Sequence, residues 1–186
     1  MVVAVERILV ICSANRCRSP LAAALLRDHL VGRSPEAHVA SAGFGDAGAP
    51  ATSATVETAS ALGLDLAEHR SRAVESALLV RADLILTMER YHVREVVVQD
   101  PDAWDRTFTL KELVRRGEAT GARGAGEGLG DWCARVGTGR ERGELLGASV
   151  TDDVADPTSG GAAEHERTAE ELQDLVTRLV GLAWPG

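Results

Sequence analysis

Residues 12–20 read Cys-Ser-Ala-Asn-Arg-Cys-Arg-Ser-Pro, and the interpretation of the whole chain starts from them. Four apolar residues, 8–11, come directly before this run, and a stretch rich in leucine and alanine, 21–26, follows it. The apolar residues predict a buried parallel strand, and the second stretch predicts a helix. Pro20 suits a first helical turn, where the N–H that proline lacks would have no partner. We therefore expect a strand, a tight loop and a helix N-terminus in succession.

Such a junction is suited to bind an anion. The backbone N–H groups of residues 13–18 and the positive end of the helix dipole would point to one place. A cysteine in such a place is favoured as the thiolate, which is the nucleophilic form. Arg18 can hold two oxygens of a phosphate with its planar guanidinium group. The pattern therefore predicts phosphoryl transfer to the sulfur of Cys12, which would split hydrolysis into two steps.

The run Cys-x2-Asn-x-Cys-Arg-Ser-Pro, between a strand and a helix, resembles the phosphate-binding loop of the low-molecular-weight protein tyrosine phosphatase family. The resemblance implies a cysteine-dependent phosphomonoester hydrolase, with Cys12 as nucleophile and Arg18 as the arginine that holds the phosphate. Ser19 would hydrogen-bond the sulfur of Cys12. The other residues expected to surround the phosphate are Ser13, Ala14, Asn15, Arg16 and Cys17.

Three residues outside the loop also match family positions. Asp156 stands in an Asp-Pro dipeptide just before the last expected helix, where family members carry their general acid. Asp100 is also followed by proline, so the dipeptide alone does not decide, but Asp100 does not match the family position. The resemblance further implies that Ser41 helps to hold the phosphate loop and that His69 hydrogen-bonds the loop asparagine, Asn15.

Strands and helices are expected to alternate along the chain, which argues for one three-layer α/β domain with a four-stranded parallel sheet and helices on both faces. This is also the fold that the resemblance implies. Ligands in such folds bind at the carboxyl ends of the strands, where Cys12 is expected. The expected strands are 8–11, 38–43, 83–88 and 106–110. The expected helices begin at about 20, 52, 73, 89, 111 and 164, the last running to 182.

A Gly-rich segment at about 117–150 interrupts this pattern. We interpret the chain as a single phosphatase domain, residues 1–186, with a flexible insertion there. One helical turn is expected around residues 131–136, and Trp132 is expected to fix the segment to the body of the domain.

Composition excludes several classes of protein. The formal net charge of −8 and the lack of a basic block argue against nucleic acid as a main partner. The chain has no apolar run long enough to cross a membrane, and the stretch Met1–Arg7 does not resemble a signal peptide. Three cysteines do not form a secreted disulfide framework, so a cytoplasmic protein is expected. No ligand spacing suggests a metal, and the mechanism needs no cofactor.

Alternatives remain open at this point. An arsenate reductase on the same fold would need two further cysteines downstream, and only Cys133 is present. A non-catalytic phosphate- or phosphoprotein-binding module would not need Cys12, Arg18 and Asp156 together. As a phosphatase, the chain would act on phosphotyrosine in a protein, on phosphoarginine or on a small phosphoester. The sequence does not indicate the oligomeric state. A reversible Cys12–Cys17 disulfide is a further hypothesis.

The sequence also departs from the family at the positions that are expected to line the substrate slot. Thr158 and Ser159 follow the Asp-Pro dipeptide, where an aromatic residue is usual, and Phe44 is the one aromatic residue in the small-residue loop that follows the Ser-Ala-Gly triplet. Arg16 stands at a loop position that is usually uncharged. It is expected either to favour acidic groups beside the phosphate or to point into solvent.

Overall fold

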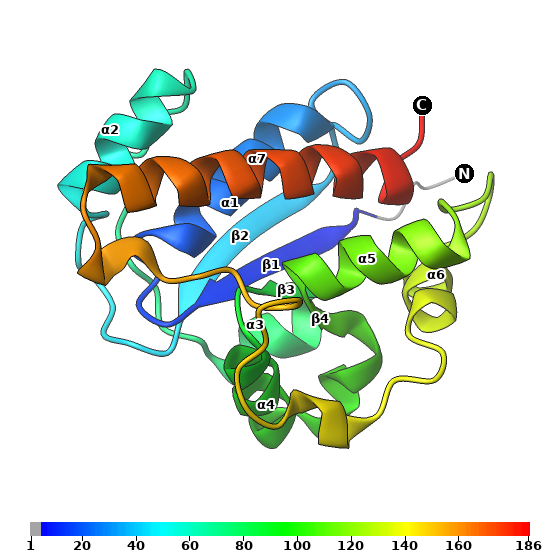
Figure 1. Ribbon diagram of the computed structural model, residues 1–186. Helices are drawn as coiled ribbons and strands as arrows, with labels where there is room; N and C mark the ends of the chain where they lie inside the picture. Colours follow the sequence, from blue (N-terminus) through cyan, green and yellow to red (C-terminus); the bar gives the residue numbers. More distant parts are fainter. Residues whose placement is uncertain (1–4) are drawn as a thin grey trace.

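A four-stranded parallel sheet with strand order β2-β1-β3-β4 lies between two layers of helices (Figure 1). The structure is a computed structural model that describes residues 5–186. The expected fold class is confirmed. The elements are β1 (Arg7–Cys12), α1 (Arg18–Leu30), β2 (His38–Gly43), α2 (Ser53–Ala61), α3 (Ser76–Arg81), β3 (Leu84–Thr87), α4 (Arg90–Gln99), β4 (Thr107–Thr109), α5 (Leu110–Thr120), α6 (Leu129–Val136) and α7 (Ala162–Ala183), with short 3-10 turns at Pro101–Arg106, Arg142–Leu145 and Pro157–Ser159.

Strand β1 is buried on both faces, which explains its unbroken apolar sequence. Because successive side chains of a strand point to opposite faces, Ile8 and Val10 pack in the cluster formed with α1 and α7. Leu9 and Ile11 point the other way and pack in the smaller cluster formed with α3 and α4. Cys12 ends this strand, so the reactive loop begins at the carboxyl edge of the sheet.

The last helix closes the larger of the two layers. Leu172, Val176 and Leu179 form its buried stripe, at the spacing typical of one face of a helix. In Figure 1 α7 runs across α1 on the same side of the sheet. Packing of α7 against α1 also fixes the loop before α7, which carries Asp156.

The Gly-rich segment differs from the expectation, because most of it is folded onto the domain. Helix α5 continues through Gly117 to Thr120, and α6 lies beside the end of α5, with residues of both helices in the larger core cluster (Figure 1). Gly117 lies inside α5 because Trp132 packs against it: a Cβ there would lie 3.1 Å from the Trp132 ring. Trp132 is fully buried, as expected of a residue that fixes the segment. That the segment is an insertion stays a prediction.

The expectation that Met1–Arg7 carries no signal peptide concerns residues 1–4, which lie outside the described part of the chain. Among residues 5–186, no helix combines the length and the apolar character needed to cross a membrane.

Candidate active site

Cys12 and the loop after it form an anion-binding junction at the carboxyl end of β1. The Sγ atom of Cys12 lies 3.0 Å from the Oγ atom of Ser19, in the first turn of α1. Helix α1 begins without a side-chain cap, since its N-cap residue Cys17 makes no capping hydrogen bond. The first N–H groups of the helix therefore have no side-chain acceptor and suit an anion.

Asn15 gives the loop its shape. It is the one non-glycine residue with positive φ (52°) in the described chain, and it is completely buried. Its Nδ2 group donates to the hydroxyls of Ser19 and Ser41, both at 2.9 Å, and its Oδ1 accepts the Arg72 N–H at 2.9 Å. Its backbone carbonyl accepts from His69 Nε2 at 2.7 Å. These bonds offset the cost of the left-handed conformation and bring Ser41 and His69 to the loop.

Arg18 is almost fully buried and donates to four acceptors, one of which is Ser13 Oγ at 3.5 Å. One Nη atom donates to Glu89 Oε1 at 2.5 Å and to the Val154 carbonyl at 2.8 Å. The other Nη atom donates to Asp156 Oδ2 at 2.5 Å. Residues from the two ends of the chain therefore meet at one guanidinium group. Glu89 was not predicted from the sequence.

Asp156 lies beside Arg18, with its side chain 40% exposed. Its Oδ1 atom accepts the Thr158 N–H at 3.0 Å and the Thr158 hydroxyl at 2.7 Å. Burial raises the pKa of this carboxyl, but the Thr158 hydrogen bonds and the Arg18 charge lower it by more, so the net pKa is below its usual value. Without a ligand, Asp156 is therefore held as the carboxylate.

The segment that carries Asp156 is anchored by ion pairs that the sequence did not reveal. Asp152 is buried and accepts from Arg90 at 2.7 Å and from Arg115 at 2.9 Å. Asp153 accepts the Arg90 N–H at 2.8 Å. These contacts tie the acid loop to the start of α4 and to α5, so its position does not depend on Arg18 alone.

His92 is a further site residue that the sequence reasoning missed. Its Nδ1 atom accepts the Glu89 N–H at 3.1 Å, so its proton lies on Nε2, which donates to Ser13 Oγ at 3.0 Å. Burial and the Arg18 charge lower the pKa of His92 to about 3, so the ring is neutral. Phe44 stacks on it, with ring centroids 5.9 Å apart. The pattern Glu-x-x-His at a helix start is a capping box and could have pointed to this contact.

The remaining residues of the loop are Ala14, Arg16 and Cys17. Ala14 is exposed, and Arg16 donates through Nε to the Pro50 carbonyl at 2.8 Å, so it is tied to the neighbouring loop. Burial raises the pKa of the Cys17 thiol, whose sulfur lies 3.8 Å from His165 Nδ1. All three cysteines are free thiols, and the Cys12–Cys17 disulfide stays a prediction.

One of the open alternatives, the arsenate reductase, finds little support in the geometry. Cys133 is completely buried in the core, and burial raises its pKa to about 12, so it is not placed to relay oxidation from the loop. Residues 5–186 contain no cluster of three or more histidine, cysteine or acidic side chains that could hold a metal ion.

Comparison with known proteins decides the family. The family model described as low molecular weight phosphotyrosine protein phosphatase matches residues 7–122, more than half of the chain. The chain belongs to this family. The low-molecular-weight phosphatases are enzymes, and the phosphatase function predicted from the loop is thereby confirmed.

Individual low-molecular-weight phosphatases resemble the chain over different lengths. A probable protein-tyrosine-phosphatase EpsP from Ralstonia solanacearum is 42% identical over 110 residues, which cover 59% of this chain and 73% of that protein. A protein-arginine-phosphatase from Geobacillus stearothermophilus is 31% identical over 175 residues, 93% of each chain. A solved structure of the arginine phosphatase YwlE, a mutant with a phosphorylated active-site serine, has a TM-score of 0.70 and 27% identity, covering 94% of this chain and 93% of that one.

Proposed function

We propose that this phosphatase removes phosphate from phosphorylated proteins through a cysteinyl-phosphate on Cys12. The observation that carries the proposal is that Asp156, which is partly exposed, pairs with Arg18 in the loop that begins at Cys12, while Cys12 and Arg18 are themselves buried. Arg18 and the loop N–H groups would bind the equatorial oxygens of the phosphate and stabilise their charge in the transition state. The phosphorylated serine in the related YwlE mutant supports a covalent route.

In the first step, the Cys12 thiolate forms a bond to phosphorus while the bond to the leaving group breaks. Asp156 gives its proton to the leaving atom. In the second step, a water molecule attacks phosphorus, Asp156 takes a proton from it, and the sulfur leaves as thiolate. Ser19 Oγ already accepts from Asn15 Nδ2, so its own proton can be donated to the sulfur and can stabilise the thiolate in both steps.

Asp156 must exchange partners for this sequence to run. In the ligand-free state it is a carboxylate paired with Arg18. A bound phosphate dianion would take over the Arg18 guanidinium and place negative charge beside the carboxyl, and both changes raise the pKa of Asp156. Substrate binding would thus prepare the acid by removing its ion pair.

Phosphotyrosine is the first substrate class to test, and phosphoarginine is the second. Relatives that match about 60% of the chain are named tyrosine phosphatases, whereas a relative that matches 93% of it is named an arginine phosphatase. Phe44 is stacked on His92 and would supply one aromatic wall for the substrate, whereas the exposed Thr158 and Ser159 would supply none. We place the protein in the cytoplasm, which its three free thiols support.

The test measures phosphate release from p-nitrophenyl phosphate, a phosphotyrosine peptide and a phosphoarginine peptide. We expect Cys12→Ser to be inactive and Asp156→Asn to lose roughly 10²- to 10⁴-fold on the phosphotyrosine peptide, and less on p-nitrophenyl phosphate, whose leaving group needs no proton. Asp100→Asn is the matched control, since it changes the other Asp-Pro dipeptide, and it should keep full activity. No release from any substrate by the wild type would refute the proposal.

A further inference from the structure

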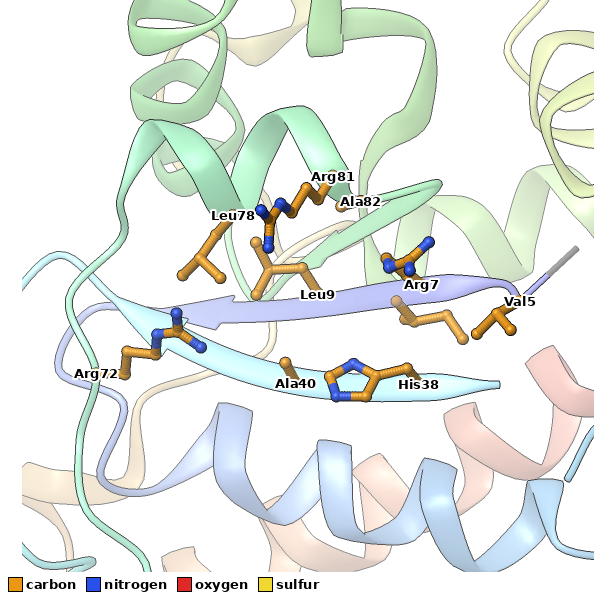
Figure 2. Close-up of a pocket in the computed structure, with 10 residues that line it drawn as sticks. Val5, Arg7, Leu9, His38, Ala40, Arg72, Leu78, Arg81 and Ala82 are labelled. Atoms are coloured by element: carbon orange, nitrogen blue, oxygen red, sulfur yellow. The ribbon is translucent and has the colours of Figure 1, made fainter. Parts of the chain in front are cut away.

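A second hollow lies on the opposite face of the sheet from α1 and α7. It is a groove of about 340 Å³ between α3 and the strands β1 and β2 (Figure 2). Its floor is apolar and consists of Leu9, Ala40 and Leu78, which belong to the smaller core cluster. We call it the α3 groove. It is separate from the phosphate loop.

Positive charge surrounds this apolar floor. Arg7, Arg72 and Arg81 line the α3 groove together with His38. Within residues 5–186, none of these three guanidinium groups makes a hydrogen bond or an ion pair, whereas Arg106 is paired with Asp100 at 2.9 Å. Three unpaired arginines are gathered here although the chain has 28 acidic and 20 basic residues. This concentration of charge suits an anionic ligand.

The shape of the α3 groove suits an extended peptide. Arg72 lies beside the carboxyl ends of β1 and β2, where its carbonyl accepts the Gly43 N–H at 2.8 Å, and Arg7 begins β1 (Figure 2). The six residues of β1 between these levels span roughly 17 Å. A single phosphate cannot bridge that length, whereas about five extended residues can. Asp83 accepts the Arg7 N–H at 2.7 Å and offsets part of the positive charge at that end, so Arg72 and Arg81, which lies above Leu9, are the stronger binding groups for carboxylates (Figure 2).

The α3 groove also leads towards the catalytic loop. Arg72 lines it with its side chain and holds Asn15 Oδ1 with its backbone N–H. Phe44 packs in the same apolar cluster as Leu9 and stacks on His92, which bonds Ser13. We propose that the α3 groove binds an extended acidic segment of the phosphoprotein substrate. That the segment belongs to a substrate rests on the function proposed above; the binding of an acidic peptide does not.

The binding test uses the full chain with its phosphate loop blocked by orthovanadate. Fluorescence anisotropy measures the affinity for a labelled pentaglutamate peptide and for pentaglutamine. We expect pentaglutamate to bind more tightly, and Arg81→Glu to weaken it roughly tenfold, because reversal removes an attraction and adds a repulsion. Arg142→Glu is the matched control, since Arg142 lies beside Trp104 and does not line the groove; it should bind within twofold of wild type.

A second readout separates the groove from catalysis. Arg81→Glu should leave turnover of p-nitrophenyl phosphate unchanged and should raise KM, not lower kcat, for a phosphotyrosine peptide with a pentaglutamate tail. The groove proposal is overturned if wild type and Arg81→Glu bind pentaglutamate with equal affinity, or if wild type binds an oligothymidylate as tightly as pentaglutamate. Neither result affects the phosphatase proposal. A wild type without phosphatase activity overturns the latter, and the anisotropy result then still decides whether the groove binds acidic peptides.

Discussion

Gly43 ends β2 directly beside the backbone of the phosphate loop, and its replacement by alanine should disturb catalysis. A Cβ at this position would lie 2.6 Å from the Asn15 nitrogen and 2.9 Å from both the Ala14 carbonyl carbon and the Cys12 carbonyl oxygen. All three neighbours are backbone atoms, so no side-chain rotation can relieve the contact. Gly43 is itself fixed, since its N–H donates to Arg72 and its carbonyl accepts from Val74, both at 2.8 Å.

The size of the effect follows from these distances. To reach an ordinary contact distance, the loop or the end of β2 must move by roughly 0.8 Å or more. Overpacking of this kind costs about 1–3 kcal/mol of unfolding free energy, and a displacement near 1 Å at reacting groups can cost on the order of 10²-fold in rate. We therefore expect Gly43→Ala to lower kcat/KM on p-nitrophenyl phosphate by tens of times or more, beyond its effect on stability measured by urea unfolding.

Gly45→Ala is the matched control, because it makes the same change two residues later. The nearest atom to a Cβ there is Ala14 Cα at 3.5 Å, an ordinary contact. Its activity should stay close to that of the wild type. If Gly43→Ala and Gly45→Ala have the same kcat/KM, the loop is not held by the close approach of β2, and the reasoning fails.

Three further outcomes are expected. The pKa of His92 is about 3 in the folded chain and near 6.5 in the unfolded chain, so the unfolded chain binds the extra proton as the pH falls. The free energy of unfolding should therefore fall by about 2 kcal/mol from pH 7 to pH 5, and urea unfolding of His92→Asn should show a flatter pH profile. An unchanged pH profile in this variant would contradict the lowered pKa of His92. Trp132→Ala should cost about 3–5 kcal/mol in urea unfolding, whereas exposed Leu146→Ala should be nearly neutral; equal effects would mean that the Gly-rich segment does not pack on the domain. Arg140→Met removes the arginine that pairs with buried Glu112 at 2.7 Å and should lower the free energy of unfolding by about 3 kcal/mol. A second change, Glu112→Leu, should restore most of this loss, and additive losses in the double variant would argue against the ion pair.

The sheet and the reactive loop could be predicted because their signals are local. The apolar residues of β1 must be buried on both faces, and Cys12, Arg18 and Pro20 lie within one short run. The match of the whole motif to a known family then placed Asp156. None of this required knowledge of contacts distant in the sequence.

The rest of the site depends on such distant contacts. Glu89 and His92 reach Arg18 and Ser13 only because β3 lies beside β1 in the sheet, and single residues in a polar stretch give no sign of that. Gly117 led to a wrong prediction, because the flexible segment was expected to begin there and α5 instead continues through it. Glycine disfavours a helix interior, but here the space left by its missing side chain is filled by Trp132, and this packing outweighs the helix propensity.

The ion pair between Arg18 and Asp156 joins residues 138 positions apart, and this separation has a consequence during synthesis. At the speed of a ribosome, the carboxylate emerges on the order of 10 s after the arginine. Helix α7, whose leucines complete the larger core cluster, emerges later still. On the proposed mechanism, a nascent chain therefore carries its nucleophile long before its acid, and catalytic competence is among the last properties that the growing polypeptide acquires.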